Sequence, residues 1–306
     1  MKQARIVVVG SSNTDLIVQT ERIPAPGETV MGGHLTTAAG GKGANQAVAA
    51  ARLGAQVTFV ARLGADDFGK QALRKLEDEG IDCSHVQLDP GLPSGAALII
   101  VEKGGQNAIA VAPGANSELS PGDVDRAGGK LGRAQALLLQ LEVPMETVRH
   151  AAALGRREGL IVILNPAPAQ RLEPELLGQL SVLTPNESEA EILSGLKVED
   201  ESSARRAARR MREMGASSVV ITLGDKGAYL LSEDQAMLIP APKVNAVDAT
   251  AAGDAFNGAL ACALADGLPL SEAVSRANIA GAFSVTRLGA QPSLPTRREL
   301  EGFQRD

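Results

Sequence analysis

Short hydrophobic runs alternate with longer segments of mixed polarity along most of the chain. The runs are rich in β-branched residues and too short for helices, so each predicts a strand buried on both faces. They lie at 6–9, 57–60, 136–139, 160–164, 181–183 and 219–222. The segments between them are long enough for helices, at 44–53, 69–79, 145–157 and 202–214. Strands that alternate with helices predict an α/β fold with a mainly parallel sheet flanked by helices.

Two regions break this alternation. Residues 20–39 carry prolines and glycines among small and polar residues. Residues 95–102 and 107–111 are strand-like and are separated by Gly104 and Gly105 without a helix, which predicts a hairpin. Antiparallel strands inserted into an α/β protein often cover a site. We therefore expect one α/β domain with a small antiparallel β lid, the domain over 1–306 and the lid from approximately 14–38 and 92–112.

Charge and composition narrow the class of partner. The 306 residues include 30 Lys and Arg against 36 Asp and Glu, a net charge of −6, without a dense basic block. Because affinity for a phosphate backbone depends on clustered positive charge, we expect no nucleic acid partner. The apolar run at 6–9 is too short for a secretory signal, and no apolar stretch reaches the length of a membrane span. We expect a cytoplasmic protein that binds no membrane.

The segment 247–258 places small residues and an acidic one at the predicted start of a helix. Ala251, Ala252 and Gly253 would let a ligand approach the backbone. A helix N-terminus presents unpaired N–H groups and the positive end of the helix dipole, so the segment predicts an anion hole. Asp254 either complements the dipole alone or accepts the proton of a hydroxyl that attacks a phosphoryl group.

A second glycine-rich segment, 40–46, opens the predicted helix at 44–53. Its glycines allow close backbone approach, while Lys42 and Asn45 offer hydrogen-bond donors to an oxygen-rich ligand. A flexible loop with a surface lysine would have the same composition. The segment does not match a Walker-type loop, and the first strand is not followed by the G-x-G-x-x-G pattern of dinucleotide-binding folds.

Polar side chains recur just after predicted strands. They are Asn13 with Asp15, Glu142, and Asn186 with Glu189. Ligands of open parallel sheets bind outside the carboxyl ends of the strands, so repeated carboxylates there favour a site over ordinary turn residues. Residues 222–227 (TLGDKG) also follow a strand, and they form either a tight hairpin or a backbone surface along a nucleotide.

Taken together, these motifs resemble the PfkB-type carbohydrate kinases over essentially the whole chain. The two signatures of that family correspond to GGKGAN at 40–45 and DATAAGDAF at 248–256. Further matches are Asn13 with Asp15, LQLE ending at Glu142, NPAPA from Asn165, TPNESE from Thr184 and GAQPS from Gly289. Several motifs in the same order are specific, whereas any one alone is weak. The resemblance implies a Rossmann-type layering and an ATP-dependent sugar kinase.

The resemblance also implies a role for each motif. Asp254 would be the catalytic base, with an anion hole formed by Ala251, Ala252 and Gly253. The sugar would be held by Asn13, Asp15, Gly41, Lys42, Asn45, Glu142 and Asp254. ATP would lie along Asn186, Thr222, Gly224, Asp225, Lys226, Gly227, Gly253 and Asn278. Glu189 would place Mg²⁺ through water, and K⁺ would bind, partly through backbone carbonyls, at Asp248, Thr250, Ser284, Arg287, Gly289 and Ser293.

One position departs from the family pattern. Relatives usually carry Thr after the first Asp of the second signature, where this chain has Ala249. Thr250 supplies a hydroxyl one residue later, and it points elsewhere. The change bears on the response to monovalent cations and on the rigidity of the loop, whereas the base and the anion hole are kept.

The charge of the expected pocket bears on the acceptor. Its carboxylates accept hydrogen bonds from hydroxyls and repel a phosphorylated sugar. A nucleoside would need aromatic faces for its base, yet the chain has no Trp, one Tyr and five Phe, none of them in the lid segments. The expected acceptor is the 5-hydroxyl of D-ribose, giving ribose 5-phosphate and ADP. Deoxyribose, another neutral sugar and a nucleoside stay open.

Two other classes of function account for fewer features. A sugar-binding sensor would use the lid but would not need Asp254, and a nicotinamide oxidoreductase would need the missing glycine pattern. In the expected kinase, lid closure excludes water while Asp254 removes the proton of the hydroxyl. Hairpins in the lid expose strand edges that a second subunit could cover, so we expect a homodimer through the β lid.

Overall fold

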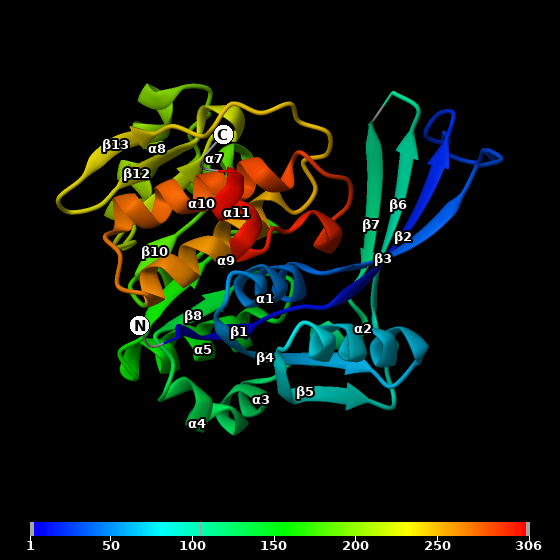
Figure 1. Ribbon diagram of the computed structural model, residues 1–306, viewed down its shortest axis with the longest axis horizontal. Coiled ribbons are helices and arrows are strands. Elements are labelled where there is room, and N and C mark those ends of the chain that lie inside the picture. The colour runs from blue at the N-terminus through cyan, green and yellow to red at the C-terminus, as the bar shows by residue number, and fades with distance from the viewer. Residues whose placement is uncertain (1–2, 105, 304–306) are drawn as a thin grey trace.

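The computed structural model describes residues 3–104 and 106–303; Gly105 of the expected hairpin and both ends of the expected domain lie outside the described residues. Within them the chain forms two sheets (Figure 1). The larger sheet has, in spatial order, β13 (Ala236–Ile239), β12 (Ala228–Leu231), β11 (Val219–Thr222), β10 (Val182–Leu183), β9 (Ile161–Leu164), β8 (Ala136–Leu139), β1 (Arg5–Val9), β4 (Gln56–Gly64) and β5 (Asp82–Asp89). The strands from β5 to β11 pair in parallel, and β12 and β13 add an antiparallel edge.

Helices cover both faces of this sheet, because alternate strand residues point to opposite sides. Ile6 and Val8 of β1 belong to one core and Val7 and Val9 to the other. The first core is closed by α1 (Lys42–Arg52), α2 (Asp67–Asp78), α9 (Ala252–Ala265), α10 (Leu270–Ser284) and α11 (Arg297–Phe303). The second is closed by α3 (Pro121–Arg126), α4 (Gly128–Leu131), α5 (Met145–Arg157), α6 (Pro174–Leu177), α7 (Glu187–Ser194) and α8 (Glu201–Glu213). The predicted α/β fold class is confirmed.

The strands predicted in the larger sheet are largely buried, whereas the edge strand β5 and the buried strand β12 were not predicted. β8 is buried at all four positions, as its sequence ALLL requires. In contrast, β5 has the sequence DCSHVQLD and no fully buried residue. An edge strand exposes one side to water, so it carries no continuous apolar run. β12 and β13 continue from β11 by tight connections at the opposite edge.

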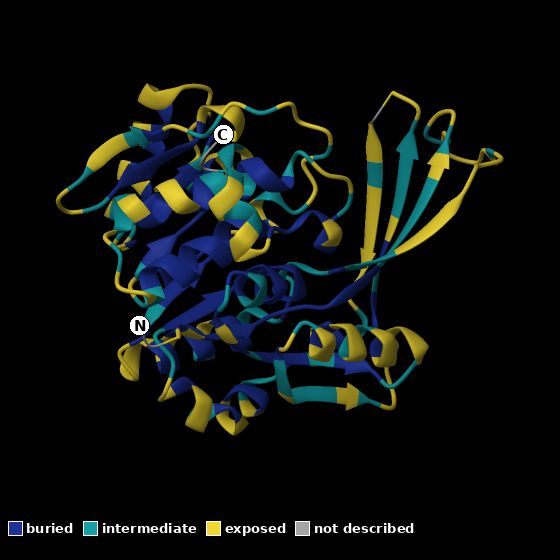
Figure 2. Cartoon of the chain, viewed as in Figure 1, coloured by how far each residue is buried: buried dark blue, intermediate teal, exposed yellow. Residues whose placement is uncertain are grey.

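The smaller sheet stands apart from the α/β body and is mostly exposed (Figure 2). It contains β3 (Leu35–Gly40), β2 (Asn13–Thr20), β6 (Gly95–Glu102) and β7 (Asn107–Ala112) in that order. The outer pairs, β2 with β3 and β6 with β7, are antiparallel, whereas the central pair β2 and β6 is parallel. The reason is that β2 and β6 continue from β1 and β5, which themselves run in the same direction. Within the residues described, no helix has the length and apolar character needed to cross a membrane.

Candidate active site

A cavity of about 190 Å³ lies at the carboxyl ends of the parallel strands. Asn165 and Thr184 directly follow β9 and β10, and Thr222 ends β11. The full lining is Lys42, Asn165, Ala167, Thr184, Asn186, Glu189, Thr222, Ala249, Ala251, Ala252, Gly253, Asp254 and Asn257. The fold thus brings the start of α1, the start of α7 and the start of α9 to one side of the sheet, where ligands of α/β proteins bind.

The start of α9 forms one wall of the cavity. Ala251 caps the helix in the left-handed conformation with φ of 60°, which costs an L-residue about 1–2 kcal/mol. α9 therefore begins at Ala252, ahead of its apolar stretch 259–265, and Asp254 lies in the first turn. The N–H groups of a first turn have no acceptor within the helix. A Cβ built on Gly253 would meet no heavy atom within 4 Å, so the space beside Gly253 is open, whereas the N–H of Ala252 donates to the carbonyl of Ala249 at 3.2 Å.

Asp254 is buried and held by two amides of α1. Its Oδ2 accepts a hydrogen bond from Asn45 Nδ2 at 2.9 Å, and its Oδ1 accepts one from Gln46 Nε2 at 2.9 Å. Burial raises the pKa of Asp254, although Lys42 and the two amides oppose the rise. A carboxylate with a raised pKa, fixed in the first turn of a helix, is suited to accept a proton from a hydroxyl.

A buried chain of amides behind Asp254 was not predicted. Gln140 Nε2 donates to Gln46 Oε1 at 2.6 Å, and Gln46 Nε2 also donates to Asn165 Oδ1 at 3.1 Å. Asn165 Nδ2 in turn donates to the carbonyl of Thr184 at 3.1 Å. The chain fixes the rotamer of Gln46 and so the orientation of the carboxylate. Gln46 and Gln140 lie inside motifs already noted, GGKGANQ and LQLE, but uncharged amides carry no signal of their own.

The carboxylates expected on the sugar lie near Asp254. Glu142 Oε2 accepts hydrogen bonds from Ser11 Oγ at 2.5 Å and from the N–H of Lys42 at 3.0 Å. Asp15 lies on β2 of the smaller sheet, and burial together with the charges of Glu142 and Asp254 raises its pKa to about 6. Asp15 and Glu142 do not line the cavity of about 190 Å³, but the influence of Glu142 and Asp254 on the pKa of Asp15 shows that the three carboxylates lie near one another.

Two glycines allow the segment before α1 to lie close to Asn13 and Asp15 of β2. Gly41 precedes α1 with φ of 88°, a left-handed conformation, and a Cβ there would lie 2.6 Å from the N–H nitrogen of Asn13. A Cβ on Gly40 would lie 2.4 Å from the carboxylate of Asp15. The glycine-rich segment 40–46 is therefore a close contact between backbones rather than a flexible loop.

The residues predicted for ATP fall into two groups. Asn186 and Thr222 form a β-bridge and both line the cavity. Residues 222–227 form the hairpin between β11 and β12, with a 3₁₀ turn at η2 (Gly224–Lys226), so the hairpin alternative is correct for the local structure. Gly224, Asp225, Lys226 and Gly227 do not line the cavity. Neither does Asn278, whose Nδ2 donates to the carbonyl of Ile239 at 2.8 Å.

Glu189 is positioned by Asn186 at the start of α7. Its Oε2 accepts from the N–H of Asn186 at 2.9 Å and its Oε1 from Asn186 Nδ2 at 3.0 Å, while Asn186 Oδ1 accepts from the N–H of Glu189. Burial raises the pKa of Glu189, against the backbone hydrogen bond from Asn186 and the charge of Lys42. The capping box therefore holds a buried carboxylate against the cavity.

The residues predicted for K⁺ connect two loops. Asp248 Oδ1 accepts from Thr250 Oγ1 at 2.6 Å, and its Oδ2 accepts from the N–H of Gly289 at 2.8 Å. Burial alone would raise the pKa of Asp248, but these hydrogen bonds outweigh it and hold the pKa below its ordinary value. The side chain of Arg287 turns away, since Nη1 pairs with Glu299 at 2.8 Å and the guanidinium lies over the ring of Phe283.

The remaining two members of that set use their hydroxyls locally. Ser284 Oγ donates to the carbonyl of Gly281 at 2.9 Å, and Ser293 Oγ, in η3 (Gln291–Ser293), donates to the carbonyl of Ala290 at 2.7 Å. For Ser284, Arg287 and Ser293, a role in cation binding would therefore use main-chain oxygens or the oxygen lone pairs of the hydroxyls.

Comparison with known proteins gives a consistent result. The family model described as pfkB family carbohydrate kinase matches residues 3–297. Ribokinase from Haemophilus influenzae is 44% identical over 298 residues, covering 97% of each chain. Deoxyribokinase from Salmonella typhi is 42% identical over 299 residues, covering 97% of this chain and 98% of its own. The structure of Arabidopsis thaliana ribokinase complexed with ribose and ATP is similar with a TM-score of 0.92 at 32% identity, covering 100% of both chains. The resemblance read from the motifs is confirmed: the chain belongs to the PfkB family of carbohydrate kinases and is a sugar kinase.

Proposed function

We propose that the protein is a ribokinase, which transfers the γ-phosphoryl group of ATP to the 5-hydroxyl of D-ribose. The observation that carries the proposal is the position of Asp254, a buried carboxylate held by Asn45 and Gln46 beside the free N-terminus of α9. The relatives named ribokinase, one of them complexed with ribose and ATP, support ribose as the acceptor. Family membership favours this kinase over a sensor or an oxidoreductase.

Each group then has a separate task. Asp254 accepts the proton of the attacking hydroxyl, so it acts in its ionised form. The N–H of Gly253 stabilises the charge on the transferred phosphoryl group without reorganisation, whereas the N–H of Ala252 first has to leave the carbonyl of Ala249, to which it donates at 3.2 Å. Asp15 and Glu142 accept hydrogen bonds from the other sugar hydroxyls and orient the attacking one. ATP occupies the side of the cavity lined by Asn186 and Thr222, next to the hairpin at 222–227.

The proposed ribokinase function includes two bound cations, Mg²⁺ and K⁺, and the residues present fit both of them. Glu189 presents a buried carboxylate to the cavity, and this hard oxygen ligand suits Mg²⁺ held through water beside phosphate groups. Asp248 keeps a depressed pKa and joins the loops that carry Thr250 and Gly289, which suits a monovalent cation such as K⁺. When bound, the two cations would neutralise phosphate charge and rigidify the anion-hole loop.

The direct test is the release of ADP with ATP, Mg²⁺ and D-ribose, with and without K⁺. 2-Deoxyribose, fructose 6-phosphate and adenosine serve as competing acceptors. We expect ribose to give the highest kcat/KM, and we expect K⁺ to stimulate turnover despite Ala249. Turnover with deoxyribose in preference to ribose would instead indicate a deoxyribokinase. This is the second candidate function, because the chain is also similar to the deoxyribokinase of Salmonella typhi. Absence of turnover with every acceptor would contradict the kinase assignment.

The activity should depend on pH through two carboxylates. Asp15, with its pKa raised to about 6, must be ionised to accept from the sugar hydroxyls. The KM for ribose should therefore increase as the pH falls through about 6, because protonation removes that acceptor. Asp254 also has a raised pKa and controls the chemical step, so kcat should fall over the acidic range as well.

The variant Asp15→Asn separates the two effects. It should raise the KM for ribose at neutral pH and make it nearly independent of pH, while kcat keeps its acidic limb. Initial rates from about pH 5 to 9 measure both quantities. A KM profile in the variant that still follows the wild-type profile would show that Asp15 is not the titrating group.

We also propose that two chains pair through the smaller sheet. Strand registers place Leu16, Val18, Leu35, Leu98 and Ile100 on one face of that sheet, opposite the face that carries Asp15. Leu35 is 65% exposed and Leu98 is 54% exposed. A contiguous apolar face on a monomer is unusual unless another surface covers it, and a second copy covers it symmetrically.

A charge on this face should therefore dissociate the pair. We expect Leu98→Glu to shift the protein to monomers in sedimentation velocity, because an ionised carboxylate would be buried without a partner. Met237→Glu, on the exposed edge strand β13 where Met237 is 43% exposed, is the matched control and should remain dimeric. A wild-type protein that sediments as a monomer would contradict the proposal outright.

A further inference from the structure

The four strands of the smaller sheet meet the α/β body at one crossing point (Figure 1). Asn13, at the start of β2, is paired with Gly40 at the end of β3 and with Gly95 at the start of β6. β7 leads through Pro113 into the 3₁₀ turn η1 (Gly114–Glu118). Any movement of the sheet relative to the body must pass through these residues.

Asn116 of η1 joins these segments with its side-chain amide. Its Oδ1 accepts from the N–H of Ser12 at 3.0 Å. Its two Nδ2 hydrogens face three acceptors, namely Asn13 Oδ1 at 2.8 Å, the carbonyl of Ser12 at 3.1 Å and the carbonyl of Pro113 at 3.0 Å. The side chain is only 1% exposed, so water cannot replace these bonds.

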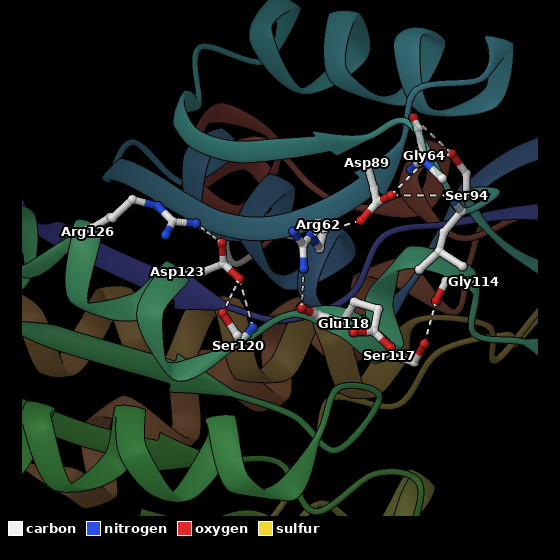
Figure 3. A network of polar contacts seen from close by, with 12 residues as sticks. Arg62, Gly64, Asp89, Ser94, Gly114, Ser117, Glu118, Ser120, Asp123 and Arg126 are labelled. Atoms are coloured by element: carbon white, nitrogen blue, oxygen red, sulfur yellow. Dashed lines mark hydrogen bonds and ion pairs between the residues drawn. The ribbon is translucent and has the colours of Figure 1, made fainter.

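Gly95 shows how tightly the crossing is packed. A Cβ at Gly95 would lie 2.2 Å from Asn116 Nδ2 and 2.2 Å from Asn13 Oδ1. The two amides therefore pack directly against the start of β6. The turn itself is braced from the other side, where Arg62 Nη1 donates to the carbonyl of Glu118 at 2.7 Å and Arg62 pairs with Asp89 (Figure 3).

The direction of the bond between the two amides has a chemical consequence. Because Asn13 Oδ1 accepts from Asn116, the Nδ2 of Asn13 is the group left to donate to a ligand. Asp15 lies two residues along the same strand and so points to the same face, where it can only accept. A hydroxyl that contacts both side chains accepts from Asn13 and donates to Asp15, and a C–H group at that place satisfies neither.

We propose that Asn116 is a positioning residue for sugar recognition. It fixes the amide of Asn13 as a donor and holds together the segments by which the smaller sheet joins the α/β body. The inference rests on the proposed ribokinase function. Asn116 does not touch the sugar; it acts through Asn13. No sequence pattern predicts this role for Asn116, because its contact with Asn13 joins residues that are 103 positions apart in the chain.

The variant Asn116→Asp tests the direction of the bond. It keeps the shape and the acceptor for Ser12, but it replaces the donor Nδ2 by an oxygen that would face Asn13 Oδ1. The Asn13 amide should then rotate and present an acceptor to the sugar. We expect the KM for ribose to rise about tenfold or more, as for loss of one hydrogen bond with an unpaired group left behind. The KM for ATP should change by less than about twofold.

Two further variants separate positioning from folding. Ser117→Ala removes the bond from Ser117 Oγ to the carbonyl of Gly114 in the same turn, at 2.7 Å, without touching Asn13 (Figure 3), and it should leave the KM for ribose unchanged. In an Asn13→Ala background, Asn116→Ala should add little to the KM for ribose, because the two residues act as one unit. Asn116→Ala also serves as the probe if Asn116→Asp does not fold.

The outcomes are distinct. An unchanged KM for ribose in Asn116→Asp and Asn116→Ala, or an effect of Asn116→Ala that is fully additive with Asn13→Ala, would overturn the inference. Equal increases in the KM for ribose and for ATP would overturn it too, since they would indicate a general effect on the fold. Failure of the proposed function is seen separately, as a wild-type protein without ribose-dependent release of ADP.

Discussion

Replacing Asp254 by Asn should reduce kcat by about 10²–10⁴-fold, which is the usual loss on removing a general base. The new amide cannot accept the proton of the attacking hydroxyl, while the anion hole stays in place. The fold should tolerate the change. Asn45 Oδ1 is buried and has no hydrogen-bond partner among the described residues, so rotation of the Asn45 amide would let this oxygen accept from the new amide. Removal of a buried charge whose pKa is raised also relieves the cost of burial.

Steady-state kinetics and direct ribose binding by calorimetry check this expectation. Binding of ribose should stay within about threefold of wild type, because Asp15 and Glu142 are untouched, and the unfolding temperature should not fall. Asp266→Asn is the matched control, since Asp266 is the exposed residue that caps the other end of α9. If Asp254→Asn turns over nearly as fast as Asp266→Asn, Asp254 is not the catalytic base.

Filling the anion hole should also abolish most of the activity while leaving the fold intact. Gly253 lies in the first turn of α9 with an ordinary helical backbone, and a Cβ there meets no heavy atom within 4 Å. Gly253→Val therefore costs the fold little. Its methyl groups would project into the cavity of about 190 Å³ and displace the phosphoryl group from the N–H donors. We expect turnover to fall by at least about 10²-fold, as for loss of one such donor.

The effect should be specific to the phosphoryl side of the site. Direct binding of ribose should persist, whereas binding of ATP or phosphoryl transfer should be lost. Gly129→Val is the control, because Gly129 is an exposed helical glycine of α4 that also has no heavy atom within 4 Å of an added Cβ. Wild-type turnover in Gly253→Val would contradict the placement of the phosphoryl group at the start of α9.

The buried framework of the fold could be predicted because its signals are local. A run such as Val7 to Val9 is apolar at every position only when both faces of the strand are covered. The edge strand β5 was missed because a partly exposed strand lacks a continuous apolar run, whereas β12 (AYLL, fully buried) and β13 (AMLI) do carry short apolar runs that were not predicted as strands. The parallel pairing of β2 with β6 was also not predicted, since it depends on the direction of β1 and β5 rather than on any residue of the smaller sheet.

The candidate site divides in the same way. Gly41 could be recognised from sequence because its positive φ and its close approach to the backbone of Ser12 and Asn13 restrict the residue type locally. The amide chain of Gln46, Gln140 and Asn165 could not, since the partners are 94 and 119 residues apart. Asn278 and residues 224–227 were predicted along ATP from motif order, but they lie outside the lining of the cavity, so their contacts with ATP stay predictions.

The sequence by itself determined the α/β class, the position of Asp254 at the start of a helix and the family, because periodicity and glycine requirements are properties of neighbouring residues. Only the tertiary structure decided how those groups behave. The raised pKa of Asp254 comes from burial, and that of Asp15 from burial and the nearby carboxylates; the orientation of Asn13 comes from Asn116. Desolvation and hydrogen bonding depend on atoms that the fold brings together from more than 100 residues apart.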